Sequence, residues 1–349
     1  MVKIKDIARL ANTSIGTVDR AINNKPGISA ETKQRILKIA ASLDYTPNKI
    51  GQALVRKNKN IKLGFILGPT KNPYFEEMRL GLEQAKKELN EYGITTYIHA
   101  MDFNSEENQI LLLEELKSLG VSGIALNAIN SEKVRKAIDA LVDSGIKIVT
   151  CNTDNKKSKR SCFIGFENEM SGRVAAELLA KFNGEKGRFL VDVGFKYILA
   201  HMDRLKGFKD KIAESYPDIK IVKIIESEED DAKAFEKTLL ALNEDPGING
   251  IFEAGFGITG VVNAVKKKKL KQKVKILGYD YTSLTEHYVK EGLVDAIICQ
   301  DPVKHGYVPL KILSELVMES KEPKHKVYLT GLDIRLRENL HINKQEWDI

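Results

Sequence analysis

The 349-residue sequence predicts an α/β protein with a small helical head at its N-terminus and a larger body of doubly wound parallel sheets. Two observations predict this class. Residues 1–60 are basic and show helical apolar spacing, whereas the rest of the chain alternates short apolar runs with helical stretches. The body contains more such runs than one small sheet needs, so we expect two sheets joined by right-handed crossovers.

The composition is that of a folded protein, with 42% hydrophobic and 30% charged residues, and it excludes wholesale disorder. No apolar run approaches the roughly 18 residues that a membrane helix needs. Residues 1–6 lack the apolar core of a signal peptide, so we expect a cytoplasmic protein. The three cysteines are too few and too scattered for a disulfide framework or a zinc site, which predicts buried free thiols at Cys151, Cys162 and Cys299.

The positive charge is concentrated at the N-terminus. Residues 1–60 hold 12 basic and 4 acidic residues, a net charge of +8, whereas the remainder holds 43 basic and 44 acidic residues. A basic head on a nearly neutral body is typical of proteins that bind a polyanion.

The head shows the pattern of a helix-turn-helix. Apolar residues recur with helical spacing from Ile4 to Ala11, and Ser14 then provides an N-cap for a second short helix. A loop-forming stretch follows, and Ser29 caps a third helix that ends before Pro47. Two short helices joined by a tight turn, with a third helix to close the core, form the helix-turn-helix unit.

Residues 49–57 are long enough for only two helical turns and contain Gly51. A helix this short is marginal in water, so we expect the segment to be a linker that folds against a partner.

The body is predicted to contain buried parallel strands, separated by helices, at Leu63–Leu67, Thr95–Ile98, Gly123–Leu126, Ile146–Thr150, Arg188–Val193, Ile219–Ile224, Gly250–Phe252, Val274–Leu277 and Asp295–Cys299. Helix starts are indicated by Asp301-Pro302 and by two pairs that resemble capping boxes, Asn104 with Glu107 and Ser283 with Glu286.

Polar and aromatic residues gather where these strands end. Ligands of such folds bind at the carboxyl ends of parallel strands. Aromatic faces combined with amides, carboxylates and a guanidinium suit a polyol, because hydroxyls need both donors and acceptors. The candidates are Asn72, Tyr74, Phe75, Asn127, Asn152, Arg204, Tyr279, Asp280 and Gln300.

One motif favours an enzyme instead. The stretch Gly255-Phe256-Gly257-Ile258-Thr259-Gly260 matches the dinucleotide fingerprint, and Asp280 follows twenty residues after the last glycine. An NAD(P)-binding enzyme is therefore the alternative hypothesis. The motif lies deep in the body, however, and no catalytic acid or base accompanies it. We expect no enzymatic activity, no cofactor and no metal, because the Walker A, His-Glu-x-x-His and Gly-x-Ser-x-Gly motifs are missing and the six histidines have no ligand spacing.

The head closely resembles that of the LacI/GalR (lactose repressor) family of bacterial transcription regulators, and the body is similar to the periplasmic sugar-binding proteins. The resemblance covers essentially the whole chain. The residues that carry it are Ile4-Lys5-Asp6-Ile7-Ala8, Thr13-Ser14-Ile15-Gly16-Thr17-Val18-Asp19-Arg20-Ala21-Ile22-Asn23, Ile28-Ser29-Ala30-Glu31-Thr32 and Leu43-Asp44-Tyr45-Thr46-Pro47-Asn48.

The resemblance implies a recognition helix in the major groove and a hinge helix that orders on DNA, with Leu54 wedged into the minor groove. It implies a homodimer on a pseudo-palindromic operator. The implied DNA-binding residues are Ser14, Ile15, Gly16, Thr17, Asp19, Arg20, Asn23, Asn48 and Leu54. Asp19 departs from the usual small polar residue, so it either accepts a hydrogen bond from a cytosine or faces away from DNA.

The family also implies a type I periplasmic-binding-protein-like body that binds a sugar, polyol or sugar phosphate between two lobes. Protein effectors stay an open alternative. The expected domains are the helix-turn-helix at 1–47, the hinge helix and linker at 48–60, and the body at 61–349. One lobe is expected at about 61–163 and 293–321, and the other at about 164–292 and 322–345. The expected function is an allosteric regulator, a repressor, of carbohydrate metabolism genes.

Overall fold

The computed structural model describes residues 4–22, 26–43, 60–69, 72–102, 105–270, 273–319 and 322–340. The chain divides into two compact units, residues 1–55 and 56–349, which are described separately. Most of the predicted hinge segment, with Asn48 and Leu54, lies outside the described residues, as does Asn23.

The head is a three-helix unit of α1 (Ile4–Leu10), α2 (Ile15–Ile22) and α3 (Ala30–Ser42). The caps are the predicted ones: the Ser14 hydroxyl accepts from the Thr17 amide at 3.1 Å, and the Ser29 hydroxyl accepts from Thr32 at 3.2 Å. These bonds satisfy backbone donors that a helix start leaves open. The apolar faces meet in a small core of Ile7, Ala8, Ala11, Val18, Ala21, Ile36 and Ala40.

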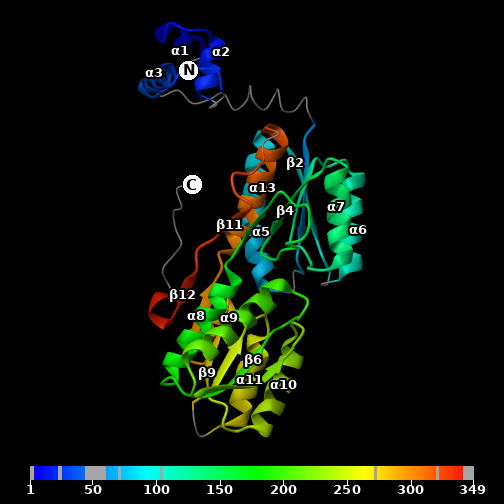
Figure 1. Cartoon of the computed structure of the whole chain (residues 1–349), viewed down its shortest axis with the longest axis vertical. Coiled ribbons are helices and arrows are strands. Elements are labelled where there is room, and N and C mark those ends of the chain that lie inside the picture. Colours follow the sequence, from blue (N-terminus) through cyan, green and yellow to red (C-terminus); the bar gives the residue numbers. More distant parts are fainter. Residues whose placement is uncertain are drawn as a thin grey trace. The chain divides into compact units, whose positions relative to one another are not determined.

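The body contains two six-stranded sheets (Figure 1). The first sheet has the order β11-β5-β4-β3-β1-β2 and the second has the order β12-β10-β9-β8-β6-β7. All pairs are parallel except β10 with β12. The strands are β1 (Lys62–Leu67), β2 (Thr95–Ala100), β3 (Gly123–Leu126), β4 (Lys147–Cys151), β5 (Cys162–Gly165), β6 (Gly187–Asp192), β7 (Ile219–Ile225), β8 (Gly250–Glu253), β9 (Lys275–Tyr279), β10 (Ala296–Cys299), β11 (Val327–Leu329) and β12 (Asp333–Arg335).

Helices cover both faces of each sheet, as parallel sheets require (Figure 1). The first lobe has α5 (Pro73–Glu91) packed on α13 (Pro302–Glu319), and α6 (Glu106–Ser118) beside α7 (Glu132–Asp143). The second lobe pairs α8 (Asn168–Phe182) with α9 (Leu199–Ser215), and α10 (Asp231–Glu244) with α11 (Ile258–Lys268). It also has α12 (Ser283–Lys290), and a short 3₁₀ helix, η1 (Arg337–Asn339), follows β12.

Glycines allow two of these helix pairs to approach closely. A Cβ on Gly81 of α5 would lie 1.9 Å from the Val303 carbonyl oxygen of α13. A Cβ on Gly260 of α11 would lie 2.1 Å from the Asp231 carbonyl oxygen of α10. Any larger residue at these positions would force the helices apart.

The predicted lobe boundaries are wrong in three places. β5 runs to Gly165 in the first sheet, β10 belongs to the second sheet, and β11 returns to the first. The physical reason is pairing: β10 hydrogen-bonds β9 and β12, whereas β11 extends the edge of β5. The chain therefore crosses between lobes after β5, after β10 and after β11.

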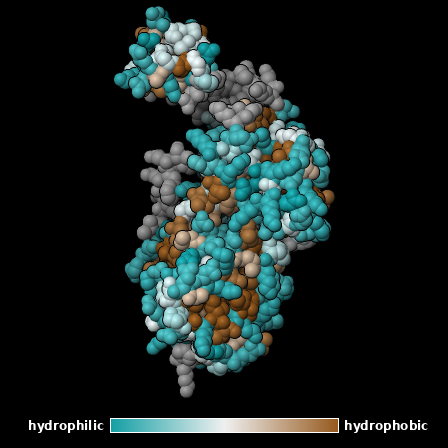
Figure 2. All heavy atoms as spheres, in the orientation of Figure 1, coloured by the Kyte–Doolittle hydropathy of each residue, from teal (hydrophilic) through white to brown (hydrophobic). Residues whose placement is uncertain are grey.

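The nine predicted strands are all present, and Asp301 precedes α13 as expected. Of the two predicted capping boxes, the one at α12 is displaced by one residue, since Thr282 forms a box with Thr285. Asn104 lies outside the described residues, and Ser105 caps α6. Cys151, Cys162 and Cys299 are buried free thiols, as predicted. Hydrophilic residues cover much of the face shown in Figure 2. Within the described residues, no helix is long and apolar enough to cross a membrane.

Candidate functional site

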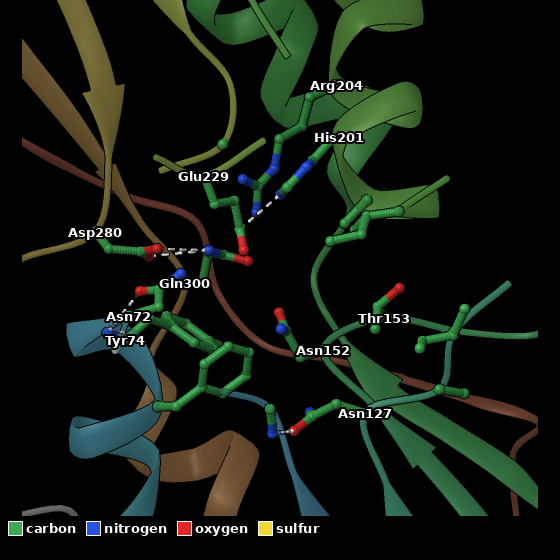
Figure 3. A pocket seen from close by; sticks show the side chains of 17 residues that line it. Asn72, Tyr74, Asn127, Asn152, Thr153, His201, Arg204, Glu229, Asp280 and Gln300 are labelled. Atoms are coloured by element: carbon green, nitrogen blue, oxygen red, sulfur yellow. Dashed lines mark hydrogen bonds and ion pairs between the residues drawn. The ribbon is translucent and has the colours of Figure 1, made fainter. Parts of the chain in front are cut away.

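A small cavity of about 50 Å³ lies between the two lobes, at the carboxyl ends of both sheets (Figure 3). It brings together eight of the nine predicted ligand residues: Asn72, Tyr74, Phe75, Asn127, Asn152, Arg204, Asp280 and Gln300. Tyr279, the ninth, lies behind this lining and contacts Arg204. That these side chains bind a ligand stays a prediction.

On the first lobe, two asparagines have structural roles at the cavity wall. The Asn72 carboxamide caps α5 by accepting from the Tyr74 amide at 3.0 Å. The Asn127 oxygen accepts from the Gly68 amide at 3.0 Å, and its nitrogen donates to the Cys151 carbonyl at 3.0 Å. Asn127 therefore ties the ends of three neighbouring strands together and fixes the floor of the cavity.

A buried hydrogen-bonded chain runs from the cavity to the crossovers. The Tyr74 hydroxyl makes a short contact with His305 Nδ1, and His305 Nε2 lies 2.9 Å from the Thr330 hydroxyl. That hydroxyl also lies 3.1 Å from the carbonyl oxygens of both Gly165 and Gln300. Thr330, which follows β11, thus joins its own crossover to those that follow β5 and β10. Burial raises the pKa of Tyr74 well above its usual value, so its hydroxyl stays protonated.

On the second lobe, Arg204 of α9 is held on several sides. Its Nε donates to the Asn168 side chain at 2.9 Å and one terminal nitrogen donates to the Ala254 carbonyl at 2.8 Å. The guanidinium carbon lies 3.7 Å from the centroid of the Tyr279 ring, a cation–π contact. The bonded groups preorganise this cation and use part of its donor capacity.

Asp280 and Gln300 form a polar pair opposite Arg204 (Figure 3). The Gln300 nitrogen donates to the two Asp280 oxygens at 2.9 and 3.1 Å. Among the described residues, the buried Gln300 Oε1 has no hydrogen-bond partner. An unsatisfied buried acceptor is costly, so this oxygen is suited to receive a ligand hydroxyl.

The sequence analysis missed His201 and Glu229, which also line the cavity. His201 Nε2 lies 3.6 Å from a Glu229 oxygen, and its Nδ1 accepts from the Phe195 amide at 3.1 Å. Burial lowers the pKa of His201 to about 3, so the ring is neutral. Burial raises the pKa of Glu229 to about 7, and nearby Asp280 raises it further whereas Arg204 opposes the rise. His201 precedes Arg204 by one helical turn, a spacing that indicates the shared face.

Three lining residues adopt the left-handed backbone region: Asn152 (φ 61°), Glu229 (φ 54°) and Asp280 (φ 65°). This conformation is rare for residues other than glycine and is least unfavourable for Asn and Asp. Strained backbone persists where the surrounding structure fixes it, and it concentrates at binding sites.

The glycine motif does not form a phosphate cradle. The Glu253 carboxylate accepts from the Gly255 amide at 2.8 Å, and an Asp192 oxygen lies 3.4 Å from the position of a Cβ on Gly257. Both acids are buried, and burial together with their mutual repulsion raises the pKa of Glu253. Carboxylates beside this turn disfavour a pyrophosphate. Gly260 serves helix packing instead, and the described residues include no cluster of three metal-ligating side chains.

The head presents the start of α2 to solvent. Ser14, Ile15, Gly16 and Arg20 are exposed, with Ile15 54% exposed despite its apolar side chain. Thr17 and Asp19 are half-buried, and the Thr17 hydroxyl lies 2.8 Å from that of Ser14.

Comparison with known families decides the classification. Residues 3–48 match the bacterial regulatory proteins of the lacI family, and residues 63–322 match the periplasmic binding protein domain. The chain belongs to the LacI family. The resemblance inferred from the sequence is thereby confirmed, and so is the two-part fold.

Relatives of this LacI-family chain are regulators. It is 25% identical over 341 residues to the HTH-type transcriptional regulator MalR of Clostridium butyricum, which covers 95% of this chain and 97% of the relative. It is 26% identical to the ribose operon repressor of Haemophilus influenzae, over 98% of this chain and 99% of that one.

Among solved structures, the LacI-family body resembles a solute-binding protein from Burkholderia graminis in complex with D-arabinose, with 25% identity and a TM-score of 0.76. The match covers 81% of this chain and 98% of that one. A glucose-galactose binding protein from Geobacillus stearothermophilus has the same fold, with 24% identity and a TM-score of 0.75, over 81% of this chain and 99% of that one.

Proposed function

We propose that this protein is a sequence-specific DNA-binding repressor of carbohydrate metabolism genes, controlled by a sugar or sugar-like effector in the interlobe cavity. The observation that carries this proposal is the combination of a lacI-type head with a sugar-binding-protein fold whose cavity is lined by amides, acids and aromatic rings. Its relatives are transcriptional regulators rather than enzymes, which supports a regulatory role without catalysis.

The head is suited to read a major groove through α2. Ile15 is exposed and able to contact a thymine methyl, and Arg20 is exposed and able to contact a phosphate or base edge. Gly16 offers no side chain, so it allows close backbone approach. The Ser14 and Thr17 hydroxyls form a cap that fixes the start of the helix, and Asn23, Asn48 and Leu54 complete the proposed DNA surface.

A homodimer fits this function. One head reads only a short half-site, and two heads on a two-fold axis read a pseudo-palindrome with greater affinity and specificity. The proposed place of action is the cytoplasm, where the operator lies.

The proposed control is allosteric. A ligand in the cavity contacts both lobes and so favours one arrangement of them over another. The lobes are also joined across the cleft by an ion pair, Lys156 with Asp203 at 3.2 Å, and the Tyr74–His305–Thr330 chain of the first lobe reaches the crossover that follows β11. In this proposal, a change in the arrangement of the lobes alters how readily the hinge segments of the two protomers fold on DNA. Because a short helix is only marginally stable, a small change in free energy is enough to shift its folding.

Hydrogen exchange on residues 49–57 tests the proposed function. The amides of this segment should exchange rapidly in the free protein and become protected on operator DNA. An effector should change that protection. Equal exchange with and without DNA would contradict the proposed role of the hinge.

A further inference from the structure

The charges around the cavity are unbalanced. Among the described residues that line it, Arg204 is the only one with a permanent positive charge, whereas Glu229 and Asp280 are acids. The buried acids Asp192 and Glu253 lie at neighbouring strand ends of the same lobe. The second lobe therefore surrounds one arginine with four carboxyl groups.

Arg204 is poorly placed to neutralise an anionic ligand. Its guanidinium donates to the Asn168 side chain and to the Ala254 carbonyl, and its face lies on the Tyr279 ring. A phosphate or carboxylate is usually held by several cations or by a forked pair of free guanidinium donors. The lining offers no lysine that could supplement this arginine.

Glu229 faces the same part of the cavity as Asp280. Figure 3 shows both side chains beside Gln300, and the charge of Asp280 helps to raise the pKa of Glu229. The Glu229 side chain is only 13% exposed, so solvent screens little of its field. At a pH above 7, where Glu229 is ionised, a ligand anion placed there would meet two carboxylates in a water-poor site.

The loop that carries Glu229 is fixed by the backbone. The Ser227 amide donates to Asp192 at 3.1 Å, the Glu228 amide donates to the Gly194 carbonyl at 2.8 Å, and Asp230 caps α10. Glu228 and Glu229 are both left-handed, with φ of 58° and 54°. This strained loop is held in place, so the acid cannot easily swing out of the cavity.

We propose that Glu229 makes the cavity selective for uncharged polyhydroxylated ligands and excludes sugars that carry a phosphate or a carboxylate. This inference rests on the proposed function, in which the cavity takes a sugar-like effector. The carboxylates and Gln300 Oε1 accept hydrogen bonds, and hydroxyls are the donors that satisfy them without added charge. Glu229 is thus a specificity-determining residue that composition and motif did not reveal.

Isothermal titration calorimetry on the full chain tests the proposal with matched pairs of ligands. The pairs are D-glucose with D-glucose 6-phosphate, D-galactose with D-galacturonate, and D-ribose with D-ribose 5-phosphate. We expect the uncharged member of a pair to bind at least about tenfold more tightly, because one buried like charge easily produces such a factor. Glu229→Gln should reduce this preference severalfold by admitting the anion.

Glu228→Gln is the matched control, since it removes the same charge from the next residue, which is exposed and outside the cavity lining. It should leave the preference unchanged, and thermal melts should show that both variants fold. Three results would each overturn the proposal. They are tighter binding of any charged member than of its uncharged partner, equal effects of the two variants on the preference, and failure of every uncharged sugar to bind at millimolar concentration. Operator binding is measured separately, so its loss would contradict the proposed function and leave the ligand result intact.

Discussion

Glu229 illustrates the cost in folding stability that individual residues of the cavity carry. A carboxyl group that is largely removed from water, next to a second carboxylate, costs free energy in the folded state. Asp192 and Glu253 carry the same cost on the same lobe, since burial raises the pKa of both. Natural binding sites often keep such groups because they are needed for recognition.

The pKa of Glu229 gives a prediction for stability against pH. It rises from an ordinary value of 4.5 to about 7 on folding, so the folded state binds a proton more readily than the unfolded state between these values. The contribution of Glu229 to stability is therefore present below pH 4.5 and is lost as pH rises through 7. At pH 8, Glu229→Gln should raise the free energy of unfolding by roughly 1–3 kcal/mol relative to the unsubstituted protein. At pH 5, the two proteins should differ less in stability. Urea melts at both pH values measure this, and a variant less stable at pH 8 would contradict it.

Arg20 gives the second residue-scale prediction. Arg20→Ala should weaken binding to operator DNA by about tenfold and reduce the slope of log affinity against log salt by about 1, because one phosphate contact is lost. Fluorescence anisotropy over a range of salt concentrations measures both quantities. Lys266→Ala, which removes the same charge from the body, serves as the control. An unchanged slope in the Arg20 variant would place this residue off the DNA.

At the scale of elements, nine apolar runs were predictable, whereas β5 and the short edge strands β11 and β12 were not. Nine apolar runs predicted nine strands correctly, and burial on both faces explains the continuous apolar signal of those inside the sheets. β11 and β12 have three residues each, and Val327 and Leu329 are 47% and 54% exposed. Neither strand has a recognisable apolar sequence pattern, because a short, exposed edge strand is held by its backbone hydrogen bonds to the neighbouring strand. Missing β11 is also why the lobe boundaries were misplaced.

The cavity residues were predictable to the extent that they follow strands directly. Asn127, Asn152, Asp280 and Gln300 each come immediately after a strand, and the parallel topology brings them together. Glu229 lies in a loop four residues after β7, so no strand-end rule indicates it. His201 could have been inferred from its helical spacing to Arg204.

Helix packing gives a prediction for Gly260. Gly260→Ala places a Cβ about 2 Å from the Asp231 carbonyl oxygen, so α10 and α11 must separate. We expect a loss of about 3 kcal/mol in the free energy of unfolding, at the upper end of overpacking costs. Gly331→Ala, where a Cβ meets no atom within 4 Å, should change stability by less than about 0.5 kcal/mol. Chemical denaturation of both variants measures the contrast, and equal losses would contradict the packing argument.

Thr330 gives a prediction for the crossovers. Thr330→Val removes the hydroxyl that contacts Gly165, Gln300 and His305. Amides at the three crossovers should exchange faster, and stability should fall by about 1–3 kcal/mol because buried groups lose a partner. Thr330→Ser keeps the hydroxyl and should restore protection. If valine and serine behave alike, the hydroxyl does not hold the crossovers.

At the scale of the whole molecule, the division of charge matches the division of function. The head carries the net positive charge of the chain, whereas the body is nearly neutral and encloses an acid-rich cavity. In the proposed function, a basic head steers the protein to DNA and makes binding depend on salt, whereas the body supplies the proposed specificity for an uncharged ligand.

The most direct test uses the full chain to select binding sites from a random pool of double-stranded DNA. The affinity for the selected site is then measured with and without the sugar that calorimetry identifies. We predict an enriched sequence with two-fold symmetry, bound with nanomolar affinity, and a change of at least fivefold in that affinity when the sugar is present. No enriched sequence, or an affinity that the cavity ligand leaves unchanged, would contradict it.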